Sequence, residues 1–101
     1  MTKYFTLEES PYHPGKFRIN LDFEKFPPIL TSGSYNILPA RLMNLSYAEY
    51  LRFCRDQCGG EIIGKNSLYP VVYFTKDSPA TELLQTLNTR MEVVAKNVFN
   101  S

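Results

Sequence analysis

Apolar and polar residues alternate without interruption over residues 16–23, which read Lys-Phe-Arg-Ile-Asn-Leu-Asp-Phe. A period of two over this length is typical of a β-strand that has one buried face and one solvated face. A shorter aromatic and β-branched run at residues 3–7 predicts a second strand. Because Pro11, Pro14 and Gly15 place turns between the two runs, we expect the strands to pair as an antiparallel hairpin.

A helix is predicted from about Tyr47 to Gln57, and both of its ends carry specific signals. Ser46 and Glu49 have the spacing of a capping box, in which each side chain bonds the backbone N–H of the other residue. Gly59 supplies the left-handed residue that ends many helices. The residues that recur at steps of three and four on the apolar face are Tyr47, Tyr50, Leu51, Cys54 and Cys58.

Residues 61–63 and 68–75 are rich in β-branched and aromatic side chains and predict a second hairpin. Pro70 has no N–H, so the second of these strands lies at an edge or begins its pairing after Pro70. A last helix follows, with Ser78 as its N-cap and Pro79 in its first position, and extends towards Asn97. Its apolar positions follow a seven-residue repeat: Ala80, Leu84, Leu87, Met91, Val94 and Val98.

The repeat has two interpretations. The helix either lies on the sheet of its own chain or forms a self-association seam through residues 80–98. We favour the first, because the repeat is shorter than the about three or four heptads that indicate a coiled coil. The sequence therefore predicts one α+β domain over residues 1–101. We expect an antiparallel sheet of about four strands with two helices on one face, in the order ββαββα, and one further helical turn at Pro39–Met43.

Charge and composition argue against several classes of function. Eleven Lys and Arg residues face ten Asp and Glu residues, which leaves a net charge of +1. The basic residues are scattered along the chain, whereas proteins that bind nucleic acid usually cluster them on one surface. A hydrophobic content of 44% argues against disorder, and no apolar run is long enough to span a membrane. We expect a small soluble domain that does not bind membranes.

The two cysteines are predicted to be packing groups. Cys54 and Cys58 lie four residues apart on one helix face, which is poor geometry for a disulfide between them. This favours a cytoplasmic location, with both thiols packed as small hydrophobic groups. Together with His13 they offer three metal ligands, whereas a structural zinc site needs about four. We expect no metal site.

Catalytic motifs are weak in this sequence. Residues 59–66 match most of the spacing of a phosphate-binding P-loop, but Asn66 replaces the hydroxyl residue that such a loop requires after its lysine. The predicted helix also precedes this loop instead of following it. His13, the only imidazole, lies between two prolines with no recognisable nucleophile motif nearby. We expect a protein that is not an enzyme and holds no cofactor.

The aromatic content is high, with seven Phe, seven Tyr and no Trp. Two interpretations remain open: a surface of exposed tyrosines that contacts a partner, or a core of aromatic rings with the hydroxyls at its rim. Phe53 falls off the apolar stripe of its helix and therefore indicates a second contact surface. The candidate binding residues are Tyr47, Tyr50, Arg52, Phe53, Arg55 and Lys65.

Residues 42–74 contain two stretches, Asn-Leu-Ser-Tyr-Ala-Glu-Tyr-Leu-Arg-Phe and Tyr-Pro-Val-Val-Tyr-Phe, and this segment resembles small accessory proteins of bacteriophages and mobile elements. The resemblance implies a non-enzymatic inhibitor that binds a bacterial defence protein, such as a CRISPR nuclease complex, in the host cytoplasm. One alternative is an accessory protein that binds nucleotides or nucleic acid, including a cyclic-nucleotide sponge, through tyrosine stacking with Lys65 and Arg18. Another is a virion accessory protein that forms a homodimer through residues 80–98.

Overall fold

The structure is a computed structural model that describes residues 3–26, 37–64, 70–76 and 79–99. The predicted N-cap Ser78 and the candidate binding residue Lys65 lie outside these ranges. In chain order, the elements are β1 (Phe5–Glu9), β2 (Phe17–Leu21), the 3-10 turn η1 (Phe23–Lys25), α2 (Leu38–Leu42), α3 (Tyr47–Gln57), β3 (Glu61–Ile63), β4 (Val71–Tyr73) and α4 (Ala80–Phe99). The α+β class is confirmed, and so is the helical turn near Pro39.

Both predicted hairpins form. β1 pairs antiparallel with β2, and β3 pairs antiparallel with β4. β1 extends to Glu9, beyond the predicted end at residue 7, and Glu8 stands opposite Arg18 in the ladder. Opposite charges at facing positions of two strands make a favourable cross-strand pair. β4 begins directly after Pro70, as the missing N–H of that residue predicts.

The single sheet of about four strands is not formed, and this prediction is corrected. The two hairpins meet at one bridge, where Phe17 and Phe74 exchange two backbone hydrogen bonds of 2.8 and 2.7 Å. If the pairing continued, Pro70 would stand opposite Leu21 with no N–H to donate. The strands separate after the bridge and leave two sheets of two strands each.

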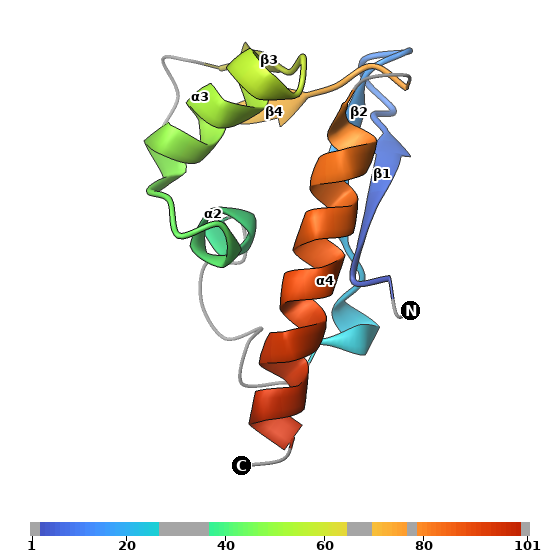
Figure 1. The fold of residues 1–101 in the computed structure, drawn as a ribbon. Helices are drawn as coiled ribbons and strands as arrows, with labels where there is room; N and C mark the ends of the chain where they lie inside the picture. The colour runs from blue at the N-terminus through green and yellow to red at the C-terminus, as the bar shows by residue number, and fades with distance from the viewer. Residues whose placement is uncertain (1–2, 27–36, 65–69, 77–78, 100–101) are drawn as a thin grey trace.

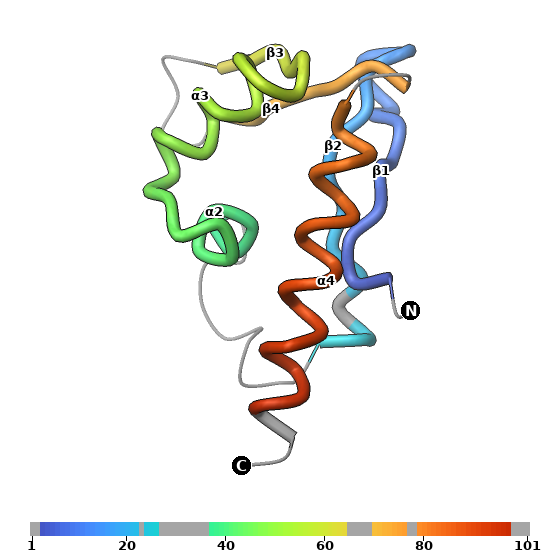
Figure 2. The backbone as a smooth tube through the Cα atoms, viewed as in Figure 1, coloured from blue at the N-terminus to red at the C-terminus, as the bar shows by residue number. Residues whose placement is uncertain are grey.

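The two long helices consequently cover different hairpins instead of one common face. α4 runs alongside β1, whereas α3 packs against β3 and β4 near the N-terminal end of α4 (Figure 1). The backbone trace shows the short helix α2 between α3 and the middle of α4 (Figure 2). One continuous hydrophobic core still joins all of these elements.

Ala80, Leu87 and Met91 of the predicted seven-residue repeat belong to the core-facing stripe of α4, whereas the side chain of Val98 lies outside the described residues. Leu87 and Met91 have no exposed surface within the single chain, and Ala80 is equally buried. Leu83 and Ala95, which are outside the predicted repeat, complete the stripe. The central residues of a self-association seam are therefore already covered by the chain's own core.

α3 begins and ends as the sequence predicts. The Ser46 hydroxyl accepts from the backbone N–H of Glu49, and the Glu49 carboxylate accepts from that of Ser46, both at 3.2 Å. These hydrogen bonds lower the pKa of Glu49. After the helix, Gly59 adopts a positive φ of 67°, a conformation that glycine adopts without steric cost.

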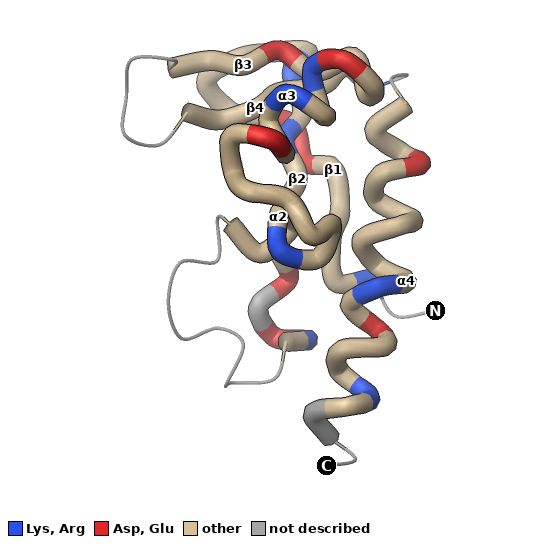
Figure 3. The backbone as a smooth tube through the Cα atoms, turned by 60° about the vertical axis from the view of Figure 1, so that its left-hand side comes forward, with Lys and Arg blue, Asp and Glu red and all other residues tan. Residues whose placement is uncertain are grey.

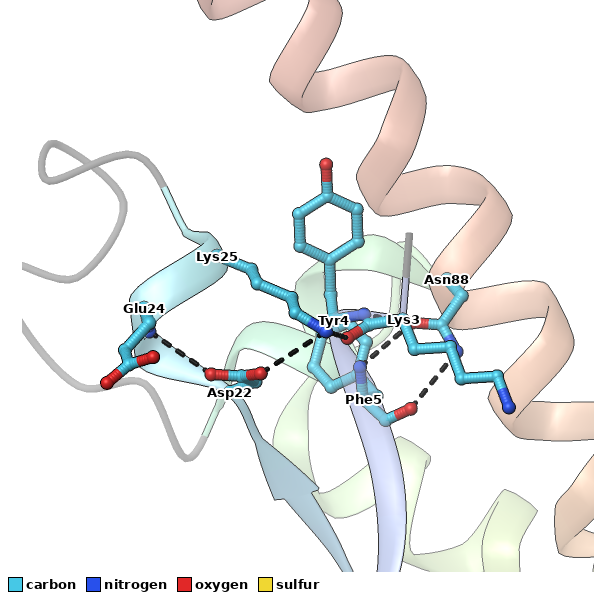
Figure 4. A network of polar contacts seen from close by, with 7 residues as sticks. All are labelled: Lys3, Tyr4, Phe5, Asp22, Glu24, Lys25 and Asn88. Atoms are coloured by element: carbon cyan, nitrogen blue, oxygen red, sulfur yellow. Dashed lines mark hydrogen bonds and ion pairs between the residues drawn. The ribbon is translucent and has the colours of Figure 1, made fainter. Parts of the chain in front are cut away.

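A buried amide on α4 holds the first strand in place. Asn88, which is only 6% exposed, accepts hydrogen bonds from the backbone N–H groups of Tyr4 and Phe5 at 2.7 and 2.8 Å. The same side chain donates to the carbonyl of Phe5 at 3.1 Å. Figure 4 shows this amide facing the backbone of β1. The edge of β1 that faces away from β2 is its outer edge. At Phe5, the Asn88 amide forms the hydrogen bonds on this edge that the backbone of a neighbouring strand would otherwise form.

Candidate functional site

The candidate binding residues of α3 separate into two groups. Arg52 and Arg55 are exposed on its outer face, and Phe53 is half-buried on its flank. Tyr47 and Tyr50 lie on the inner side, where their rings stack with centroids 6.4 Å apart. The structure therefore does not bring the predicted set together on one surface.

The prediction that Tyr50 is an exposed contact residue is wrong. Its side chain is 4% exposed and belongs to the core, together with Leu51 and Cys54. Burial raises the pKa of its hydroxyl, and the neighbouring Cys54 thiol adds to this effect. The physical reason is its place in the helix, because position 50 lies on the same face as positions 51 and 54.

Tyr47 has a structural role that limits its use as a contact residue. Its hydroxyl donates a hydrogen bond of 2.5 Å to the carbonyl of Pro70, just before β4. Partial burial raises the pKa of this hydroxyl. The bond links the first turn of α3 to the second hairpin and keeps the Tyr47 ring against the protein.

Phe53 lines a cleft between α3 and α4, which we call the Phe53 cleft. Its volume is about 250 Å³. α3 contributes Phe53 and Gln57 to its walls, and α4 contributes Leu83, Glu82 and Thr86. The remaining lining residues are Met43, Cys58 and Pro79. The cleft has apolar groups at its base and exposed polar groups, such as Gln57 and Glu82, at its rim.

Charged groups surround α3 without forming a field of one sign. Arg55 pairs with Asp56 at 2.8 Å, and this hydrogen bond lowers the pKa of the carboxylate. Both partners are exposed, so the pair adds little to stability. Arg52 lies near the carboxylates of Glu49 and Asp56. Figure 3 shows basic and acidic positions interspersed along the tube.

The thiols beside the cleft are unsuited to nucleophilic chemistry. Cys54 and Cys58 are free and buried, which confirms the prediction that they pack as small hydrophobic groups. Burial raises the pKa of Cys54 to about 12 and also raises that of Cys58. Both therefore remain protonated at neutral pH, whereas a nucleophilic cysteine acts as the thiolate.

The remaining candidate for acid–base chemistry lies away from the cleft. His13 is exposed in the β1–β2 connection, and its ring and that of Tyr73 form a T-shaped contact at a centroid distance of 5.4 Å. Within the described ranges, no three His, Cys, Asp or Glu side chains come together in a way that would hold a metal ion. The chemistry that the Phe53 cleft itself offers is apolar contact with polar groups at the rim.

Sequence reasoning identified Phe53 but missed its partners in the cleft. Leu83 lies four residues before Leu87, so helical spacing would have placed it next to the core stripe. Met43 follows α2, and its place in the cleft depends on how α2 packs between α3 and α4.

Comparisons of the chain with protein families, with curated proteins and with solved structures found no match. In the part of the chain that the structure describes, no helix is long and apolar enough to cross a membrane.

Proposed function

We propose that this chain is a non-enzymatic protein-binding domain that receives an apolar side chain of its partner in the Phe53 cleft. The observation that carries the proposal is the half-exposed ring of Phe53, which lines a cleft while Tyr47 and Tyr50 pack inward. Phenylalanine, the other aromatic residues and arginine are enriched at protein–protein interfaces relative to the rest of the surface.

The size of the cleft favours a protein partner over a small ligand. Pockets that enclose small molecules and cofactors have volumes of about 300 to 1,000 Å³. The Phe53 cleft, at about 250 Å³, is below that range and suits a single inserted side chain. Among the described residues of α3, Arg52 and Arg55 lie close to the carboxylates of Glu49 and Asp56, whereas binding a nucleic acid requires a clustered basic surface.

The resemblance of residues 42–74 to phage accessory proteins supports a specific class of partner. On this basis we propose that the partner is a bacterial defence protein, such as a CRISPR nuclease complex, and that binding inhibits it in the host cytoplasm. The geometry of the cleft supports side-chain insertion, and the resemblance alone supports the identity of the partner.

Phe53→Ala is expected to weaken capture of the partner from bacterial lysate by about tenfold or more, because truncating a residue that dominates an interface costs about 2 kcal/mol or more. The matched control is Tyr12→Ala, since Tyr12 is an aromatic residue that is 85% exposed on the β1–β2 connection. Circular dichroism checks that both variants remain folded. Captured protein is quantified from lysate with and without nuclease.

Three results would contradict the proposal: equal capture by Phe53→Ala and the wild type, equal loss in Tyr12→Ala, or disappearance of the captured material after nuclease treatment. A nucleobase absorbance in the purified protein would favour the nucleotide-binding alternative instead.

A further inference from the structure

The outer edge of β1 presents backbone groups that a further strand would bond. Tyr4 accepts from the N–H of Asp22, and the N–H of Ser10 donates to Lys16. These bonds direct the even-numbered residues of β1 towards β2, so the odd-numbered residues direct their N–H and C=O groups outward. At Phe5 this outward position is filled by Asn88. At Leu7 and Glu9, within the described ranges, no protein group bonds the outward N–H or C=O.

A groove lies directly beside these free backbone groups, between β1 and the first half of α4. We call it the β1–α4 groove, and its volume is about 330 Å³. Leu7 and Leu84, both half-buried, line it from the two sides. Thr81 and Gln85 are exposed on the helical wall. The remaining lining residues are Lys3, Phe5, Thr6 and Asn88.

Charge is distributed unevenly along the outer edge of β1. Lys3, Leu7 and Glu9 are odd-numbered and so project to one face of the strand. The groove therefore has a cation near one end and an apolar centre, and the exposed carboxylate of Glu9 lies just beyond its lining, where β1 ends. An antiparallel strand complementary to this series carries a basic residue, an apolar residue and an acidic residue in its own N-to-C direction.

We propose that the β1–α4 groove binds an extended segment of a partner protein, which adds to β1 as an antiparallel strand at Leu7 and Glu9 and carries the basic–apolar–acidic series. Strand addition of this kind obtains affinity from backbone hydrogen bonds and specificity from alternate side chains. Because α4 walls the groove on the side opposite β1, the opening suits a single extended segment and not the folded edge of a second copy. This surface is separate from the Phe53 cleft, and the two proposals stand independently.

The probe is the peptide acetyl-Lys-Thr-Val-Thr-Glu-amide. It places lysine opposite Glu9, valine opposite Leu7 and glutamate opposite Phe5, where the glutamate is the diagonal neighbour of Lys3. Nuclear magnetic resonance titration is expected to shift the amide protons of Leu7 and Glu9 saturably, with an affinity in the millimolar range. The reversed peptide acetyl-Glu-Thr-Val-Thr-Lys-amide is expected to bind about tenfold more weakly, because it sets its glutamate opposite Glu9 and brings its lysine diagonal to Lys3.

Two exposed substitutions on α4 provide a matched pair. Gln85→Trp places a large side chain in the groove and is expected to weaken peptide binding by about tenfold. Thr89→Trp, one helical turn further along and outside the groove lining, is expected to leave binding unchanged. Both positions are exposed, so both variants should fold.

The proposal is overturned if the peptide leaves the Leu7 and Glu9 amides unshifted, or if the two peptides bind equally well. Equal weakening by both tryptophan variants would also overturn it. If the same amides shift with protein concentration in the absence of peptide, the occupant of the edge is a second copy of the chain, and the proposed partner segment is wrong.

Discussion

Asn88→Ala is expected to lower the free energy of unfolding by about 3 kcal/mol, the largest effect that we predict for a single substitution in this chain. The amide of Asn88 satisfies two backbone N–H groups and one carbonyl of β1 in a buried position. Alanine can replace none of these bonds. The N–H groups of Tyr4 and Phe5 would then remain buried without an acceptor, which costs more than the bonds themselves contribute.

Thermal unfolding of Asn88→Ala should show a midpoint about 15 °C below that of the wild type, given the size of the chain. Asn97→Ala is the matched control, because it makes the same change at an exposed position of the same helix. The control should differ little from the wild type. Faster amide exchange at Phe5 would locate the effect in β1. A loss similar to that of the control would mean that water replaces the amide and that Asn88 does not hold β1.

Gly60→Ala is expected to lower the free energy of unfolding by about 2 kcal/mol, because a methyl group has no room at this position. An ideal Cβ at residue 60 would lie 2.6 Å from Cγ2 of Val72 and 3.1 Å from Cε1 of Phe74. It would also lie 3.1 Å from the carbonyl oxygen of Cys54, which accepts a hydrogen bond from the Gly60 N–H. The backbone approaches the second hairpin here too closely for any side chain.

Gly15→Ala is the control for Gly60→Ala in chemical denaturation. The Gly60 variant tests the lack of space for a side chain, and the Gly15 variant tests backbone strain alone. A Cβ at residue 15 meets no atom within 4 Å, but the residue has a positive φ of 81°. Strain of this kind costs an alanine about 1 kcal/mol, so Gly15→Ala should be the milder variant. The reverse order would show that Val72 and Phe74 move aside and that the contact at Gly60 is not tight.

Local signals predicted the elements of the fold, and their assembly depended on contacts that the sequence does not display. The alternation over residues 16–23 and the capping box at Ser46 gave β2 and α3 nearly as observed. The order and register of strands that are not adjacent in sequence depend on tertiary geometry. The single bridge between Phe17 and Phe74, at which the two hairpins meet, therefore had no local signature.

For the candidate sites too, local patterns were informative and features that depend on tertiary packing were missed. Phe53 was identified because it departs from the apolar stripe of α3, and Tyr50 was misassigned because its aromatic character was given more weight than its place on that stripe. Asn88 was missed, although a polar residue between the buried Leu87 and Met91 is a detectable interruption. The β1–α4 groove was missed because it forms only when α4 packs beside β1.

Photochemical crosslinking from the rim of the Phe53 cleft tests most directly whether the chain binds a protein partner there. A benzoylphenylalanine at Gln57, which is exposed beside Phe53, should form one discrete protein adduct in nuclease-treated bacterial lysate. The same group at Tyr12 should form none, and adding Phe53→Ala to the Gln57 variant should reduce the adduct about tenfold or more. Absence of an adduct from position 57, equal adducts from positions 57 and 12, or an adduct that Phe53→Ala leaves undiminished would contradict a partner-binding role for this cleft.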